Sequence, residues 1–387
     1  MIQRSPNTHH GRGTPTAGGV PAWYAAANAS EWVALPNSTL TTSGVGWAGT
    51  SPGGSSNYDA VVIAWSGGVL NTVGCFYAGS FHAGTFLVIF GGGHGDYGGN
   101  ELYAYGPLED DSPAWHRLTD PSIPAPTNVA RLGGYPVSRH TYDTLAYLPT
   151  LNKMLCIGVA GNYSEGNTFN VGDLFDFAAD PGAVNPWSAS DTNFPAYNGG
   201  GTGVIGLVGG YNPATAKAWG LGKGNSQLLG VFDAGSGTWS SYSKNNPNGV
   251  GANKAAVDPN HNILVFMGVS GVVYAQDLAN PTNSIYAPTC SGTSPGTGNN
   301  VLEWDSVANR FVSWDRTGKT LYFLTPGANP AAGGDDWAWT STTPAGGTTP
   351  AAAHANGTYG RFRVNNGSLR GVVLMPLHNQ PICFYKF

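Results

Sequence analysis

A β-propeller is the fold class that the sequence predicts, and three observations support it. A faint repeat occurs six times at a spacing of roughly 45–60 residues, a period typical of propeller and solenoid proteins. Each unit holds only strand-like segments: one ends in glycines, the next contains an aromatic residue, and the last is centred on Trp or Tyr. Turn formers are abundant, with 58 Gly and 27 Pro in 387 residues. A repeat built from strands alone predicts an all-β propeller.

The composition bounds the possible partners. Charged residues make up 10% of the chain and aromatic residues 12%. Ser, Thr, Asn and Gly must therefore cover most of the surface, which suits contact with sugars outside the cytosol, because aromatic rings and neutral polar groups recognise them. The net charge of −5 and the lack of a basic run argue against nucleic acid. No apolar stretch approaches the ~20 residues that span a bilayer, and the N-terminus carries no secretory signal. We expect an extracellular or virion location.

The clearest unit defines the first blade. From the axis outward, its strands are expected at AVVIAWS from Ala60, FLVIFGGG from Phe86, ELYAYG from Glu101 and AWHRL from Ala114. An extra strand at Val73–Gly79 lengthens the first connection. Because a blade is a four-stranded antiparallel sheet, these segments account for one blade.

The next four units repeat this order. Their strands are expected to begin at His140, Lys153, Asp173 and Pro186 in blade two, at Thr202, Lys217, Leu228 and Thr238 in blade three, at Lys254, Ile263, Val272 and Ser284 in blade four, and at Val301, Arg310, Thr320 and Asp336 in blade five.

The last blade has three strands of its own, beginning at Tyr359, Gly371 and Ile382. The segment Glu31–Asn37 has the Trp-centred pattern of an outer strand and supplies the fourth. The N-terminal strand then closes the ring onto the C-terminal blade, which leaves no open sheet edge. Six blades follow, and seven is the competing count if Val73–Gly79 belongs to a separate blade. One propeller domain is expected over residues 23–387, after an N-terminal tail over residues 1–22.

The glycines that follow the second strand and the late Trp resemble the kelch motif, and so the galactose-oxidase type of propeller. Only the first blade shows this pattern cleanly, so the chain resembles a divergent member of that class. The segments GGGHGDYGGN and SRHTYDTLAYLP are also similar to bacterial and phage propeller proteins that have no established activity. The resemblance implies the architecture and no particular chemistry.

Antiparallel order predicts where a site would lie. Connections between second and third strands emerge on the same face as the connections between blades, and rigid scaffolds usually place functional residues on such loops. Four of the nine histidines fall there, in the sector of blades six, one and two: His94, His140, His354 and His378. The same sector gathers Asp96, Tyr97, Glu101, Arg131, Arg139 and Tyr359.

Several functions are compatible with the residues of this sector. Glycan binding without turnover needs stacking aromatics, for which Tyr97, Tyr135, Tyr163 or Trp219 are available, together with ligand-binding groups at Asp96, Arg131, His354, Tyr359 and His378. β-Elimination on a uronic-acid polysaccharide needs a carboxylate neutraliser, a base and an acid, and the candidates are His94, His140, Tyr97 and Arg139. Purely structural roles compete with both: the glycines around His94 suit a tight turn, and Arg139 with His140 can fix one blade to the next.

The leading interpretation is a non-catalytic recognition or structural module, a phage virion-associated or surface-exposed propeller that contacts glycan. A polysaccharide lyase is the alternative. The histidine spacings match no compact zinc motif, so no metal and no cofactor are expected. The expected partners are a glycan or other virion or surface proteins. The four cysteines form no CxxC pair, and Cys156 and Cys383 lie in apolar strands, which predicts buried thiols.

Overall fold

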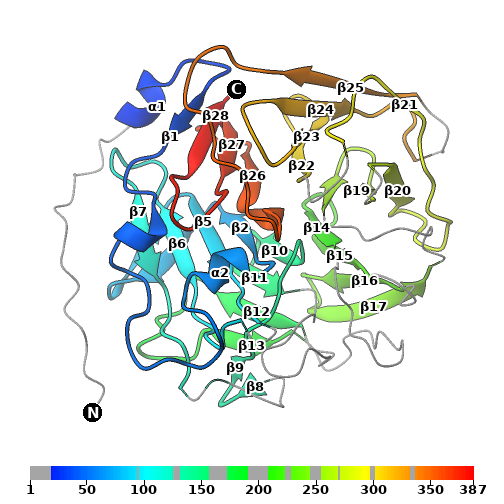
Figure 1. The fold of residues 1–387 in the computed structure, drawn as a ribbon. Helices are drawn as coiled ribbons and strands as arrows, with labels where there is room; N and C mark the ends of the chain where they lie inside the picture. The colour runs from blue at the N-terminus through cyan, green and yellow to red at the C-terminus, as the bar shows by residue number, and fades with distance from the viewer. Residues whose placement is uncertain are drawn as a thin grey trace.

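Six small antiparallel sheets stand around a common axis, and each is one blade of a six-bladed β-propeller (Figure 1). The structure is a computed structural model that describes residues 19–93, 96–123, 125, 131–156, 172–190, 208–222, 228–244, 254–268, 271–296, 301–331 and 336–387. The predicted fold class and blade count are both confirmed.

The first three blades each have four strands in sequence order. Blade one contains β2 (Gly67–Asn71), β5 (Phe86–Phe90), β6 (Tyr103–Gly106) and β7 (Ala114–Arg117); blade two contains β10 (Leu145–Leu148), β11 (Lys153–Cys156), β12 (Asp173–Asp176) and β13 (Trp187–Ala189); blade three contains β14 (Val208–Asn212), β15 (Lys217–Leu221), β16 (Leu228–Asp233) and β17 (Thr238–Ser243).

The next two blades depart from four strands. Blade four contains β18 (Ala255–Asp258), β19 (Ile263–Met267) and β20 (Val273–Asp277); blade five contains β22 (Glu303–Asp305), β23 (Arg310–Trp314), β24 (Leu321–Thr325) and β25 (Trp337–Thr342), with β21 (Cys290–Ser291) added in parallel outside β25.

The outer strand that the sequence predicts from Ser284 is therefore wrong. Only one bridge forms there, between Ala275 and Tyr286. Pro288 follows closely and cannot donate to a ladder, which explains why pairing stops.

The N-terminal strand closes the ring, as predicted. Blade six contains β26 (Phe362–Asn365), β27 (Gly371–Leu374), β28 (Cys383–Lys386) and, as its outermost strand, β1 (Trp32–Ala34). The indole N–H of Trp32 donates to the carbonyl of Lys319 in blade five at 2.9 Å. The blue strand β1 and the red strand β28 accordingly lie side by side in Figure 1.

The inner strands form a closed ring around the axis. β2, β10, β14, β18, β22 and β26 each contact the next, and β26 contacts β2. The second strands are buried along their whole length, as β5 and β19 show. Such strands read as continuous apolar runs because neighbouring blades cover both of their faces. The core therefore lies between blades, where Val88 and Phe90 of blade one meet Met154 and Phe175 of blade two.

The inner strand of blade one is not where the sequence places it. The run from Ala60 forms a short helix, α2 (Ala60–Ile63), and the strand is β2, further along the chain. Val61 and Val62 are fully buried in the core of the blade. A short apolar run fits a buried helix as well as a buried strand, so periodicity alone could not separate them.

The remaining elements lie outside the six blades. They are α1 (Ala22–Ala26), the helical turns η1 (Leu40–Thr42) and η2 (Tyr359–Arg361), and the hairpins β3 (Gly74–Tyr77) with β4 (Ser80–Ala83) and β8 (Arg131–Leu132) with β9 (Tyr135–Pro136). The extra strand predicted at Val73–Gly79 is present as β3. Cys156 and Cys383 are buried thiols, as expected. None of the helices in the described ranges is long and apolar enough to cross a membrane.

Candidate functional site

Three aromatic residues in an unusual backbone conformation converge near the axis. Trp65, Tyr142 and Tyr359 have φ of 50°, 43° and 49°. Bulky residues rarely adopt this left-handed region, and such outliers cluster at functional sites. Each one lies a few residues before an inner strand: β2, β10 and β26 respectively. The backbone N–H of Tyr142 donates to the carbonyl of Trp65 at 2.7 Å, and the rings of Tyr142 and Tyr359 meet edge to face at 5.4 Å.

His140 joins this group through its ring. The Trp65 and His140 rings lie 4.8 Å apart at 40°, and Tyr142 meets His140 edge-on at 5.9 Å. His140 Nε2 lies 3.0 Å from Asp96 Oδ2; the imidazole is 4% exposed and the carboxylate 32%. Asp96 therefore orients His140 while it still faces water. We call Trp65, Asp96, His140, Tyr142 and Tyr359 the aromatic platform.

Glycines bring the two halves of the platform together. A Cβ on Gly92 would lie 2.5 Å from Ser138 Oγ, and φ at Gly92 is 123°. The next residue, Gly93, donates its N–H to Ser138 Oγ at 2.9 Å. Only glycine permits so close an approach. Blade one is thereby fixed to the segment that carries His140.

Burial perturbs the phenols of the platform. It raises the pKa of Tyr142 to about 12, and the charge of Asp96 adds to the effect. Burial also raises the pKa of Tyr359; Tyr142 adds to the rise and Arg361 opposes it. Neither phenol forms a hydrogen bond within the described ranges. Both hydroxyls stay protonated at neutral pH and are available as donors to a bound ligand.

The blade-six side of the face carries further polar groups. His378 Nε2 lies 3.6 Å from Asp59 Oδ2. His354 accepts the backbone N–H of Asn356 at Nδ1, 3.2 Å away. The pKa of His354 is lowered, first by burial and then by Arg361, His378 and Arg316. His354 and His378 therefore lie close enough to influence one another.

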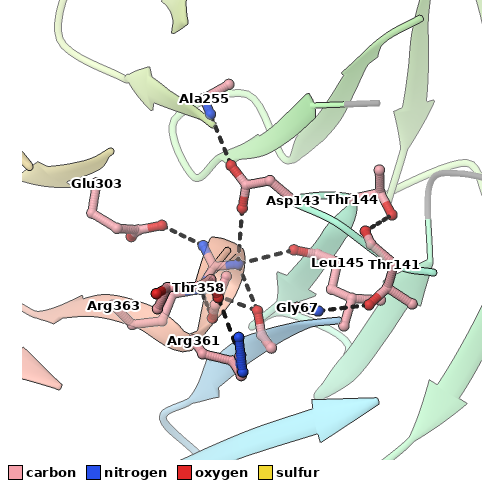
Figure 2. A network of polar contacts seen from close by, with 12 residues as sticks. Gly67, Thr141, Asp143, Thr144, Leu145, Ala255, Glu303, Thr358, Arg361 and Arg363 are labelled. Carbon is pink, nitrogen blue, oxygen red and sulfur yellow. Dashed lines mark hydrogen bonds and ion pairs between the residues drawn. The ribbon is translucent and has the colours of Figure 1, made fainter. Parts of the chain in front are cut away.

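A polar network lies among the inner strands (Figure 2). The guanidinium of Arg363 donates to the carbonyls of Gly68 at 2.6 Å and Gly360 at 2.8 Å, and pairs with Glu303. Asp143 Oδ1 lies 3.7 Å from Arg363, and Asp143 Oδ2 accepts the N–H of Ala255 at 2.8 Å. The network joins blades one, two, four, five and six.

Burial dominates the titration of this network. It raises the pKa of Asp143 to about 7, against the opposing effect of Arg363. It also lowers the pKa of Lys254, which is 1% exposed, to about 7. A buried charge is costly unless it is paired and hydrogen-bonded, as Arg363 is here.

Two residues expected in a lyase site are engaged elsewhere. The guanidinium of Arg139 is fully buried and lies 2.7 Å from Asp173, which also pairs with Arg131 at 2.7 Å. Tyr97 is 2% exposed and donates its hydroxyl to Glu101 at 2.7 Å. The structure does not present Arg139 or Tyr97 to a ligand beside His140. Arg131 is likewise held by the carbonyl of Gly134.

The other expected aromatics contribute little to an open surface. Tyr135 is half-buried and packs against the core between blades one and two. Trp219 is 3% exposed and belongs to the core. His94 and Tyr163 lie outside the described residues.

Trp65, Tyr142 and Arg316 were not among the site residues predicted from the sequence. Trp65 and Tyr142 were expected inside inner strands, where ordinary β geometry would separate them. No sequence signal marks a Trp or Tyr for a left-handed backbone, since glycine and asparagine are the residues expected there. Among the residues that the structure describes, no group of three His, Cys, Asp or Glu side chains could hold a metal ion.

Comparisons with known proteins support the fold. No protein-family model and no curated protein sequence matches the chain. The major allergen Mala s 1 of Malassezia sympodialis is similar in structure, with a TM-score of 0.51, 10% identity, and 92% of this chain and 95% of that chain covered. A chain from a nidogen/laminin complex gives a TM-score of 0.40 at 11% identity, over 72% and 87%. At these identities the likeness to the allergen concerns the β-propeller fold alone.

Proposed function

We propose that this chain is a non-catalytic recognition module that binds a glycan on the aromatic platform. The β-propeller fold is compatible with a binding module. One observation carries the proposal: the partly exposed ring of Trp65 lies on His140, beside the water-facing carboxylate of Asp96. An aromatic ring bordered by hydrogen-bonding groups is the arrangement that an amphipathic sugar ring requires.

The composition supports the same proposal. With charged residues at only 10%, most surface contacts must be made by neutral polar groups, glycine and aromatic rings. We propose a surface-exposed or phage virion-associated setting, in which the partner is a host or environmental glycan or a neighbouring surface protein. The kelch-like class of the propeller remains a prediction from the glycine and Trp pattern.

Replacement of Trp65 by glycine tests the proposal. Glycine adopts the left-handed backbone of this position without strain, so W65G removes the ring and little else. We expect the affinity for any glycan identified on an array to fall about tenfold or more, because stacking on a Trp contributes on the order of 1–3 kcal/mol. The control is F81G, which removes an exposed aromatic ring (43%) from the β3–β4 hairpin. Equal affinities for W65G and the parent protein would refute the assignment of the platform.

A lyase is the second candidate, because Asp96 orients His140 as a general base requires. Such an enzyme would have to use Tyr142 or Tyr359 in place of Tyr97 and a different cation in place of Arg139, because Tyr97 and Arg139 are engaged elsewhere. H140A should abolish the ultraviolet absorbance of an unsaturated uronate product if the chain is a lyase. If no substrate of a uronic-acid panel yields that signal with the parent protein, the lyase alternative fails.

A further inference from the structure

Ion pairing separates two arginines from all the others that the structure describes. Six arginines pair with Asp or Glu: Arg117, Arg131, Arg139, Arg310, Arg363 and Arg370. Arg316 and Arg361 have no such partner within the described ranges. Both lie on the blade-five and blade-six side of the aromatic platform, so the two arginines without a carboxylate partner lie on one side of it.

Arg361 is the buried member of the pair. Its guanidinium is fully buried and donates only to carbonyls, those of Thr358 at 3.2 Å, Val62 at 2.7 Å and Gly357 at 2.6 Å. Carbonyl dipoles hold the group in place without cancelling its charge. Burial lowers the pKa of Arg361 to about 9. The residue is a fixed positive charge behind the surface.

Arg316 is the surface member of the pair. It follows β23 on the face that carries the platform, with φ of 79°. Its Nη2 donates to the carbonyls of His354 at 3.2 Å and Ala355 at 3.4 Å, and its Nε is buried without a partner in the described residues. Its Nη1 makes no hydrogen bond in the same part of the chain and is the donor that remains. The side chain is partly exposed. Arg316 therefore has donors left for a ligand.

His354 and His378 complete this patch, which we call the cationic rim: Arg316, His354 and His378. Both imidazoles are partly exposed, and the charge of Arg361 acts on His354. Asp59 is the carboxylate nearest His378, at 3.6 Å, and no ion pair joins it to Arg316 or His354 in the described part of the chain. The charge of this patch comes from Arg316 and from Arg361, because the lowered pKa leaves His354 neutral at pH 7. A buried or half-buried arginine without a counterion is unfavourable, so an incoming anion would be bound with a gain in free energy.

We propose that the cationic rim binds the acidic group, carboxylate or sulfate, of a glycan whose ring stacks on the platform. The inference rests on the proposed function and assigns the ligand class: an acidic rather than a neutral polysaccharide. Tyr359 connects the platform to the rim, since its ring meets Tyr142 and the charges of Arg361 and Arg316 act on its hydroxyl. One sugar unit can therefore lie on the platform while the acid of that unit or the next reaches Arg316.

Calorimetric titration with matched oligosaccharides tests the subsite. The probes are an oligogalacturonate and its methyl ester, and a sulfated galactose oligosaccharide and its desulfated form. We expect an acidic form to bind about tenfold or more tightly than its neutral counterpart, because a charge-assisted hydrogen bond is lost with the acid. The ratio between the two acidic probes separates carboxylate from sulfate.

R316Q should remove this preference while it leaves binding of the neutral forms unchanged. The control is K217Q, which removes a cation that forms no ion pair with the described residues. Lys217 begins β15, where the hairpin emerges on the opposite face. A second readout is the pKa of His354, followed by NMR: saturation with the acidic probe should raise it, since the anion opposes the surrounding cations.

The outcomes separate the two proposals. Equal affinities for acidic and neutral forms, or equal losses in R316Q and K217Q, would overturn the subsite and leave glycan recognition standing. Failure of every glycan to bind would overturn the proposed function and the subsite with it. An acid preference that disappears in R316Q, together with the shift at His354, would establish the acidic ligand class.

Discussion

At the scale of single residues, left-handed backbone decides how the platform forms. Trp65, Tyr142 and Tyr359 each take φ near 45°, a conformation that costs of order 1–3 kcal/mol for a non-glycine residue. The surrounding packing must therefore hold these residues in the strained conformation. That conformation brings rings from three blades into one cluster. Sequence patterns cannot anticipate this, because they assign aromatic residues to strands.

His116 gives a pH-dependent prediction at the same scale. Its ring stacks on Tyr77 at 3.8 Å and bonds the Gly106 carbonyl at 3.1 Å. Burial lowers its pKa to about 4. The folded pKa is below the unfolded value of about 6.5, so its stabilising contribution is complete above pH 6.5 and is lost as the pH falls toward 4.

Denaturant unfolding at pH 7 and pH 5 measures this contribution. Between these values the parent protein should lose about 2 kcal/mol through His116. H116Q keeps a hydrogen-bond donor and cannot titrate, so its loss over the same interval should be smaller by that amount. The two proteins share every other titrating group, which cancels in the comparison. Equal losses would show that His116 is not buried as the structure has it.

At the scale of elements, sequence predicted strands well where apolar runs end in glycine or carry a late Trp. It located β5, β11, β19 and the closing strand β1, because these are buried on both faces or have a repeated pattern. The sequence wrongly predicted a strand at α2, because an apolar run of four residues is too short to show a helical or a strand period. It also wrongly predicted an outer strand in blade four, where Pro288 ends the pairing. Of the site, it gathered His140, Asp96 and Tyr359 on one face and missed Trp65, which lies just after α2.

The pairing register of the closing strand β1 with β28 can be tested with a disulfide. Ala34 lies directly opposite Cys383 in the β1–β28 ladder. The neighbouring pair, Leu35 with Ile382, is the hydrogen-bonded one, with an N–H···O distance of 2.8 Å. Ala34 and Cys383 are therefore a non-hydrogen-bonded pair, whose Cα atoms lie about 4.5 Å apart, within reach of a disulfide.

A34C should form that disulfide on oxidation, seen as faster migration on a non-reducing gel and a higher Tm. The bond would close nearly the whole chain into one loop, which constrains the unfolded state. V33C is the matched control, because adjacent strand residues point to opposite faces. Crosslinking of V33C but not A34C would mean that the register is displaced by one residue.

For the whole molecule, the sequence predicts the ring of blades but not the contacts among the inner strands. The repeat, together with a last blade that lacks its outer strand, is enough to predict six blades closed by the N-terminal strand. Nothing in the sequence marks Arg363 as the residue that ties the inner strands together, since its partners are mostly backbone carbonyls of blades one, two and six and a carboxylate of blade five. Carbonyl acceptors exist at every residue, so pattern analysis has nothing to detect.

R363M tests whether the centre holds the disc together. The variant leaves Glu303 and Asp143 without Arg363 among the inner strands. Breaking a fully buried pair from one side typically costs about 3–5 kcal/mol, and the loss should lie toward the lower end because Arg363 is 14% and Glu303 17% exposed. The control is R370M: Arg370 is 32% exposed, and its partner Asp305 keeps Arg310 at 3.5 Å, so the loss should be about 1 kcal/mol or less. Calorimetry should show R363M melting in one transition at a distinctly lower Tm, because the lost contacts are shared by several blades rather than confined to one. If R363M melts no lower than R370M, the closed ring of inner strands is stable without its central arginine, and packing between the blades alone holds the propeller together.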